Sequence, residues 1–597
     1  MEVEMFKKRF KLFVLLSLFS IMVIINVSCD RPSIQESQQS LFDEFINELF
    51  VEQVQSDTLS LNYTLARPED YGIQHAETTL GEYSIEHMKE ELVATEQYLH
   101  DLRKFNYKEL TADQQLTYNI LDRYLELELQ LGNYLYYLES LGPTTGLQAQ
   151  LPILLAEYNF YDRDDIDRYL ELLACVKNYF EDVAEFEREK SKQGLFMTDA
   201  VADSIIEQCM AFIESPEQNF LIEYFNEKIE SFPGLTKKEK DSYKEKNRRG
   251  ILEYVIPSYQ MLIQVLEELK GTGVNDSGLY YYPEGQSYYE LIAKIKTGSD
   301  RSMKDIIEII DTTIGDGIIE ITKQTLSDPM IFEKLESFTS FPLTDPEVIL
   351  EDLKTNILED FPPPVDVNCN IKYVHESLSD YLSPALYIIP AIDNYMDNNI
   401  YINGNDQETL ATIYTTVAHE GYPGHLYQNV YFRSKNPAPI RNLLSFTGYD
   451  EGWATYVEYY SYGYSGIDND LVNLLEVNSE IILLMYARAD IGIHYEGWNK
   501  SKAVSYIKQF VGDEAVATEI YEVLLEEPAI YLPYAIGYLE IKELRNKAQD
   551  AKGNEFNIKD FHKFMLDIGP AQFSVIEDHM EVWLNSEENI LQGDISN

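Results

Sequence analysis

The sequence predicts a mostly α-helical protein. Apolar residues recur at helical intervals over long stretches, and the three clearest are residues 116–141, 165–187 and 251–270. Prolines interrupt the pattern at a few places, which marks helix ends or kinks. The sequence contains no short-period repeat, low-complexity segment or obvious linker. We therefore expect a single large domain over residues 41–597.

One segment departs from the helical pattern. Residues 385–403, ALYIIPAIDNYMDNNIYIN, place β-branched and aromatic residues around an Asp- and Asn-rich turn. This pattern predicts a small hairpin or ribbon directly before the helix that we expect at residues 407–420. An exposed strand in this place is able to hold an extended peptide through backbone hydrogen bonds. A strand that only packs against the helix is the alternative.

The N-terminus has the composition of a targeting segment. Four basic residues precede an apolar run, residues 12–25, which is too short for a comfortable membrane span. Ser28 and Cys29 follow, and a small residue before cysteine after an apolar run resembles a bacterial lipobox. We expect residues 1–29 to be a lipoprotein signal peptide, with lipid on Cys29, and residues 30–40 to be a tether. Simple secretion and an uncleaved anchor helix are the alternatives.

The chain is strongly acidic. It carries 102 acidic and 47 basic residues, for a formal net charge of −55. Such a surface repels nucleic acid and anionic lipid headgroups. We therefore expect no nucleic-acid partner, and contact with a membrane only through the lipid anchor. An acidic excess spread over the whole surface mainly keeps a protein soluble.

The stretch TVAHEGYPGH begins like the helix of a zinc peptidase, in which a second histidine follows the first by four residues. Here the fourth place holds Pro423, and the next histidine is His425. An ideal helix turns through about 600° between His419 and His425, so a straight helix would point the two rings in different directions. Pro423 and Gly424 suit a break that turns one ring back toward the other. A proline–glycine turn between two unrelated histidines has the same sequence.

A second stretch, YDEGWATYVEYY, follows. Zinc enzymes built on a His-Glu helix often take a glutamate ligand from a later helix, and Glu451 is the candidate. Glu458 is seven residues further on nearly the same helix face, where it is able to accept a hydrogen bond from a ligand histidine. Asp450 is another candidate for that role. An ordinary acidic helix is the alternative, although Gly452 and Trp453 favour a closely packed helix start.

Taken together, these motifs resemble the bacterial DUF885 family. The segments HEGYPGH, EGWATYVE, DIGIHYEGW and PYAIGYLEIKELR match its His-Glu-x-x-Pro-Gly-His and Glu-Gly-Trp-Ala style, and the resemblance covers nearly all of the mature chain. The family is in turn similar to helical zinc peptidases that include angiotensin-converting enzyme and the thermostable carboxypeptidases. The resemblance implies a helical two-lobed domain split by a deep cleft.

The resemblance also implies roles for individual residues. By this match His419, His425 and Glu451 would bind Zn²⁺, which leaves one coordination position open for water. Glu420 would be the general base that takes a proton from the water and passes it to the leaving amine.

Two further residues correspond, by the resemblance, to groups on the oxyanion side of the cleft. His494, in GIHYEGW, and Tyr534, in LPYAIG, would donate hydrogen bonds to the oxyanion. The sequence therefore predicts a surface-anchored, zinc-dependent, peptidase-like hydrolase that acts on peptides. A zinc hydrolase of a small non-peptide ester or amide would use the same ligands. A non-catalytic binding lipoprotein would keep the fold, but it would have no need of Glu420.

Overall fold

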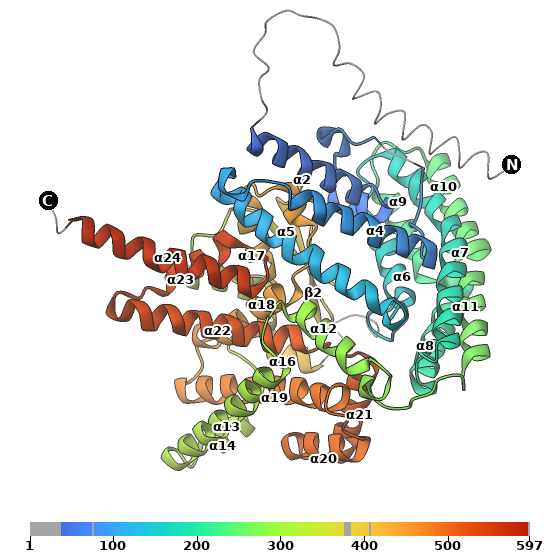
Figure 1. Cartoon of the computed structure of the whole chain (residues 1–597). Helices are drawn as coiled ribbons and strands as arrows, with labels where there is room; N and C mark the ends of the chain where they lie inside the picture. The colour runs from blue at the N-terminus through green and yellow to red at the C-terminus, as the bar shows by residue number, and fades with distance from the viewer. Residues whose placement is uncertain (1–36, 75–76, 375–383, 405–406, 595–597) are drawn as a thin grey trace, which may run out of the picture.

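The computed structural model describes residues 37–74, 77–374, 384–404 and 407–594 and is mostly helical, as predicted (Figure 1). The helices before the sheet are α2 (Gln38–Val54), α3 (Thr58–Thr64), α4 (Ile85–Leu102), α5 (Ala112–Leu131), α6 (Leu147–Glu157), α7 (Arg163–Lys192), α8 (Asp199–Ile213), α9 (Phe220–Ser231), α10 (Lys237–Gly250), α11 (Ile256–Leu269), α12 (Gly285–Thr297), α13 (Met303–Ser327), α14 (Ile331–Ser337) and α15 (Pro346–Asn356). The helices after the sheet are α16 (Gln407–Glu420), α17 (His425–Ser434), α18 (Thr447–Ser461), α19 (Asn469–His494), α20 (Lys500–Val511), α21 (Glu514–Glu526), α22 (Leu532–Lys552), α23 (Ile558–Ile568) and α24 (Phe573–Asp594).

The N-terminal boundary differs slightly from the prediction. Ser37 caps α2, and its side chain accepts a hydrogen bond from the backbone N–H of Ser40. The last residues of the predicted tether, 30–40, are therefore the first turn of a helix. Cys29 and the rest of the predicted signal peptide lie outside the described residues.

A three-stranded sheet lies beside α16. Its strands are β1 (Asn368–Tyr373), β2 (Ala385–Ile388) and β3 (Asp397–Ile402), in the order β1-β3-β2. The antiparallel pair of β2 and β3 is the predicted hairpin, and α16 has the bounds that the sequence predicts. The third strand, β1, pairs in parallel with β3 and was not predicted.

The helices pack around two separate large hydrophobic cores. The first combines α2 to α5 with most of the chain from α12 onward, apart from α20 and α21, so that helices from both ends of the sequence share it. The second is built from α6 to α11, with Leu172, Phe180, Tyr259 and Leu262 at its centre. In Figure 1 the long helices α7 and α11 lie side by side at the right edge, opposite α22 and α24. The cleft between two lobes stays a prediction.

The helices α18 and α22 touch through their backbones. A methyl group at Gly452 would lie 2.4 Å from the carbonyl carbon of Gly537, and one at Gly537 would lie 1.9 Å from the carbonyl oxygen of Gly448. Only glycine fits at such distances. The close packing that Gly452 and Trp453 led us to expect at the start of α18 is therefore present.

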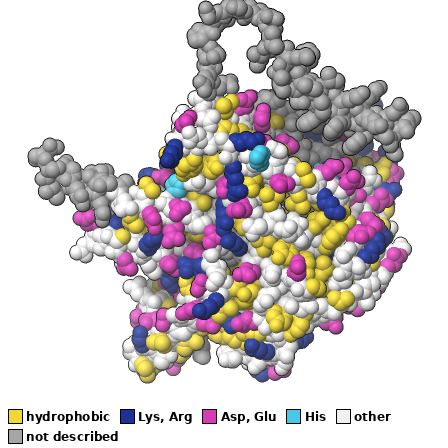
Figure 2. All heavy atoms as spheres, viewed as in Figure 1, with side chains coloured by type: hydrophobic (Ala, Val, Ile, Leu, Met, Phe, Trp, Pro, Cys, Tyr) yellow, Lys and Arg dark blue, Asp and Glu magenta, His cyan; other side chains and the backbone are white. Residues whose placement is uncertain are grey.

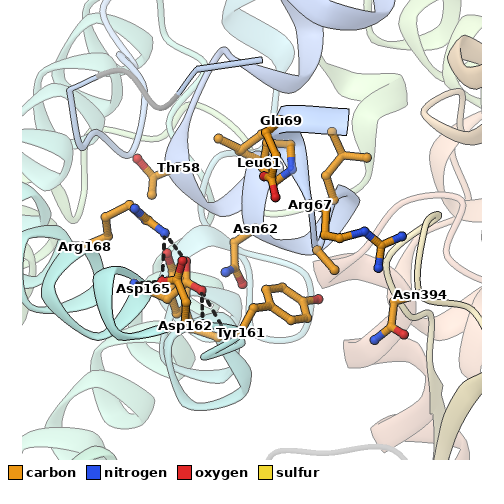
Figure 3. Close-up of a pocket in the computed structure, with 14 residues that line it drawn as sticks. Thr58, Leu61, Asn62, Arg67, Glu69, Tyr161, Asp162, Asp165, Arg168 and Asn394 are labelled. Atoms are coloured by element: carbon orange, nitrogen blue, oxygen red, sulfur yellow. Dashed lines mark hydrogen bonds and ion pairs between the residues drawn. The ribbon is translucent and has the colours of Figure 1, made fainter. Parts of the chain in front are cut away.

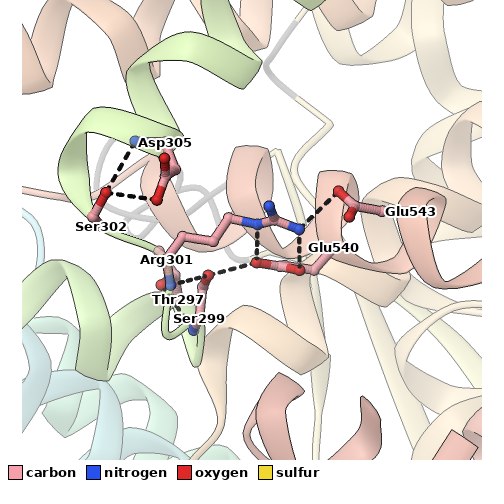
Figure 4. Close-up of polar contacts among 7 residues, drawn as sticks. All are labelled: Thr297, Ser299, Arg301, Ser302, Asp305, Glu540 and Glu543. Carbon is pink, nitrogen blue, oxygen red and sulfur yellow. Dashed lines mark hydrogen bonds and ion pairs between the residues drawn. The ribbon is translucent and has the colours of Figure 1, made fainter. Parts of the chain in front are cut away.

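A partly buried ion pair also holds α22. The carboxylate of Glu540 accepts hydrogen bonds from the hydroxyl of Ser299 and from the guanidinium of Arg301, whose Nε lies at 2.7 Å. Arg301 also pairs with Glu543 at 2.7 Å (Figure 4). The connection from α12 to α13 is thus fastened to α22.

The acidic side chains are dispersed over the visible face (Figure 2) and do not gather in one large patch. Figure 2 shows Asp and Glu side chains scattered between basic and apolar ones. Among the described residues, no helix has both the length and the apolar character needed to span a membrane.

The backbone contact of α18 with α22 predicts opposite effects of two glycine substitutions. Gly452→Ala should destabilise the protein by about 1–3 kcal/mol, because the new methyl group overlaps Gly537. Gly315→Ala, inside α13 with open space around it, should stabilise by about 0.5–1 kcal/mol through higher helix propensity. Urea unfolding of both variants measures the difference. Equal stability of the two variants would contradict the packing described.

Candidate metal centre

The helix that carries His419 ends at Glu420, and the next helix begins at His425. Between them the Tyr422–Pro423 peptide is cis. A methyl group at position 424 would lie 1.7 Å from the carbonyl oxygen of His419, so Gly424 is required where the chain doubles back. The two imidazole rings come to 4.9 Å, centroid to centroid, at an angle of 80°. The break predicted from the proline and the glycine is therefore present and brings the two histidines together.

Glu451, near the start of α18, completes a cluster with the two histidines. Its Oε2 lies 3.6 Å from Nε2 of His419 and 3.4 Å from Nε2 of His425, and one ligand atom from each residue lies within 4.8 Å of the others. Two atoms that each lie about 2.0–2.1 Å from a tetrahedral zinc are about 3.4 Å apart. The two distances from Glu451 are thus close to those between ligands of one metal ion.

The environment of Glu451 Oε2 is a second test of whether a metal ion fits among these residues. Oε2 of Glu451 is buried, and no described residue donates a hydrogen bond to it. A buried carboxylate oxygen without a partner is costly, whereas an ion between it and the two imidazoles would satisfy it. The residues present therefore fit a divalent metal with nitrogen and oxygen ligands.

Glu458 orients one of the histidines. Its Oε2 lies 2.9 Å from Nδ1 of His419. Because a carboxylate only accepts, Nδ1–H is the donor, and the lone pair of Nε2 then faces the cluster. Asp450 was the other candidate for such a role. Burial raises its pKa to about 7, and among the described contacts it receives no hydrogen bond from a ligand histidine.

The electrostatics of the cluster favour a positive charge at its centre. Burial acts to lower the pKa of His419, but the nearby carboxylates of Glu451 and Glu458 outweigh it and hold that pKa well above its usual value. The pKa of His425 is raised for the same reason, through Glu451. Burial acts to raise the pKa of Glu451, and the two histidines outweigh it in the other direction. A cation held at this place would supply the positive charge that protons on the two imidazoles otherwise supply.

Glu420 and Tyr534 lie beside the cluster without belonging to it. The Oε2 of Glu420 accepts a hydrogen bond of 2.7 Å from the backbone N–H of Tyr387, on the edge strand β2. The ring of Tyr534, in the first turn of α22, lies 6.4 Å from the ring of His419. Burial, together with the charges of Glu451 and Glu420, raises the pKa of Tyr534 far above its usual value, so the phenol keeps its proton and stays a donor.

His494 occupies a different environment. Its Nε2 lies 2.7 Å from the carbonyl oxygen of Leu524, and its Nδ1 accepts a hydrogen bond of 3.1 Å from the backbone N–H of Leu279. Burial lowers its pKa to about 4, so the ring is neutral. Both ring nitrogens are taken by the backbone, and the structure replaces the oxyanion role expected for His494 with a structural one.

Sequence reasoning missed Tyr387. The hairpin that contains it was predicted, but the backbone N–H that meets Glu420 has no side-chain signature. In an antiparallel pair, the backbone N–H groups of one strand point alternately toward and away from its partner. The N–H of Tyr387 points away from β3 and is therefore available to Glu420, and this alternation was the signal that could have found it.

A separate cavity of about 330 Å³ lies between α3, the start of α7 and the β2–β3 connection (Figure 3). Its two arginines already have carboxylate partners: Arg168 pairs with Asp165 at 2.6 Å and Arg67 with Asp70 at 2.9 Å. No residue of the metal cluster lines it.

The comparison with known families agrees with the motifs. Residues 68–580 match the family described as "Bacterial protein of unknown function (DUF885)". The chain belongs to this family. None of the curated proteins matches this DUF885 protein at a significant level.

Two solved structures share the fold of this DUF885 protein. A "putative lipoprotein" from Colwellia psychrerythraea has 20% identity and a TM-score of 0.81, over 92% of this chain and 100% of the other. A "putative lipoprotein of unknown function" from Shewanella oneidensis has 17% identity and a TM-score of 0.63, over 90% of this chain and 99% of the other. At these identities the likeness concerns the fold alone.

The geometry predicts one metal ion per chain. His419→Ala and His425→Ala should each lose most of the metal, because two ligands hold a divalent ion far more weakly than three. His87→Ala, which changes a histidine on a surface helix, should keep it. Elemental analysis after dialysis against a chelator measures the metal content. Retention of the full content by both ligand variants would refute the ligand assignment.

Proposed function

We propose that this DUF885 protein is a zinc-dependent hydrolase of peptides that acts at the cell surface. The observation that carries the proposal is the buried, unpartnered Oε2 of Glu451, which faces two imidazole nitrogens at 3.4 and 3.6 Å. The carboxylate of Glu420, which accepts a hydrogen bond from the backbone of Tyr387, and the protonated phenol of Tyr534 lie beside this cluster. Groups of the types that amide hydrolysis requires as ligands, base and proton donor therefore support the proposal.

His419, His425 and Glu451 would hold the ion. A zinc ion bound there supplies Lewis-acid chemistry and lowers the pKa of water. Glu420 follows directly after a ligand in sequence, and the N–H of Tyr387 fixes one of its oxygens. The other oxygen would take a proton from an attacking water and return it to the leaving amine.

Tyr534 is the candidate hydrogen-bond donor to the oxyanion. Because its phenol keeps its proton at all physiological pH values, it is able to donate a hydrogen bond to an oxyanion as negative charge develops. The hydroxyl is held at the first turn of a helix that is packed backbone to backbone against α18. This rigid mounting favours a donor that need not reorganise during the reaction.

The proposal predicts different losses for the base and the ligands. Glu420→Gln should keep the metal and lose about 10²–10⁴ in turnover, because only the proton transfer is removed. Tyr534→Phe should keep the metal and lose about 10²–10³. Tyr521→Phe, a buried tyrosine of the small core around α20 and α21, should cleave at the wild-type rate. A peptide-library digest, followed by kinetics on a cleaved peptide, measures all three.

The outcomes separate the alternatives. Cleavage of an ester or small amide but of no peptide would assign the same site to a non-peptide substrate. No turnover of any substrate would leave a binding lipoprotein. Turnover of a peptide by Glu420→Gln at the wild-type rate would overturn the mechanism.

We propose that a lipid on Cys29 anchors the protein to the membrane. The support is the apolar run that ends before Ser28-Cys29, together with two structural neighbours whose descriptions read "putative lipoprotein". Wild-type protein should fractionate with membranes and take up labelled fatty acid, and Cys29→Ser should do neither. Membrane association of the serine variant at the wild-type level would exclude the lipid as the anchor.

A further inference from the structure

The turn that leads into α22 has an unusual backbone. Residues 527–531 connect α21 to α22, and Tyr534 follows three residues after the turn. Ala529 in its middle has φ +62° and is completely buried. A residue with a Cβ rarely adopts this left-handed conformation, and it persists only where surrounding contacts enforce it.

One side of the turn is held by buried groups of the first core. Both oxygens of Asp490 accept a hydrogen bond from the N–H of Ala529, at 3.2 and 2.9 Å, and Tyr289 donates its hydroxyl to the same carboxylate. Asp490 is completely buried. The ammonium of Lys296 donates to the carbonyl of Pro528 at 2.9 Å.

His494 belongs to the same arrangement. Its Nε2–H donates to the carbonyl of Leu524 near the end of α21, and its ring stacks on Tyr289 at 5.6 Å and 16°. Asp490 and His494 lie one turn apart at the end of α19. The end of α19 therefore fixes the end of α21 and the turn that follows it.

The other side of the turn is held by a segment that leads into the second core. Glu527 is 5% exposed. Its Oε1 accepts hydrogen bonds from the backbone N–H groups of Thr144 and Thr145, at 2.9 and 3.0 Å, and its Oε2 accepts one from the hydroxyl of Thr145 at 2.6 Å. Leu141 and Leu151, on either side of these threonines, are core residues of the α6–α11 unit.

We propose that Glu527 and Asp490 are positioning residues for Tyr534. They hold the turn at residues 527–531 from opposite sides, so the phenol reaches the cluster only while the Thr144–Thr145 segment is docked on Glu527. The inference rests on the proposed function for the role of Tyr534. It accounts for two buried carboxylates that the mechanism leaves unused, and it makes the α6–α11 unit part of the active enzyme.

The first test is a double-mutant cycle on the zinc-loaded full-length protein, with a peptide that the wild type cleaves. Glu527→Ala should lower kcat by about 10²-fold with KM unchanged, because a misplaced donor is lost only in the transition state. In a Tyr534→Phe background the same change should cost nothing further. Glu527→Gln should restore the rate, since its amide oxygen still accepts both N–H groups.

The second test follows the phenol without turnover. 3-Fluorotyrosine at position 534 reports its environment as a ¹⁹F resonance in the metal-free protein and after addition of zinc. Glu527→Ala and Asp490→Asn should shift or broaden this resonance and reduce its response to zinc. Glu540→Gln is the matched control, because it weakens a buried carboxylate network on the same helix, beyond the turn (Figure 4). In the Glu540→Gln variant, the ¹⁹F resonance of the tyrosine at position 534 should stay at the wild-type position.

The outcomes keep the two proposals apart. A wild type that cleaves nothing refutes the proposed function, and the fluorine measurement alone then decides the positioning role. Losses from Glu527→Ala and Tyr534→Phe that multiply fully in the double variant would overturn the inference. An unmoved resonance in Glu527→Ala, or the same shift in Glu540→Gln, would also overturn it, because the turn would then contribute only to general stability.

Discussion

The break between α16 and α17 is the constraint on which the rest of the site depends. A straight helix would separate His419 from His425, whereas the doubled-back chain sets both rings against one oxygen of Glu451. The indole N–H of Trp453 donates to the carbonyl of Pro423 at 2.9 Å. The break is thereby fastened to α18, the helix that also carries Glu451 and Glu458, so the three candidate ligands and the acceptor for His419 form one unit.

The remaining groups are positioned relative to that unit. The glycine contact places α22, and with it Tyr534, at a fixed distance from α18. The edge strand β2 reaches Glu420 through the N–H of Tyr387. Contacts of this kind are made by backbone atoms or by residues without side chains, which leaves little freedom to move. The site is thus mounted on rigid elements rather than on loops, as a preorganised arrangement requires.

Much of the site could be predicted because local chemistry determines it. The bounds of α16, the break after it and the β2–β3 hairpin follow from the spacing of residues near one another in sequence. The bond from His419 to Glu458 was predicted differently, from the seven-residue spacing that puts Glu458 on nearly the same helix face as Glu451. The parallel strand β1 could not be predicted, because its partner lies 29 residues later. The surroundings of His494 also escaped prediction, since its partners are backbone groups of distant segments, which no motif records.

The central claim is that one metal ion joins His419, His425 and Glu451. The most direct measurement is a crystal structure of the purified protein with diffraction data on both sides of the zinc absorption edge. The account predicts a single strong anomalous peak about 2.0–2.2 Å from Nε2 of each histidine and from a carboxylate oxygen of Glu451. A protein with no peak at this place, or with its zinc bound by other residues, would contradict it.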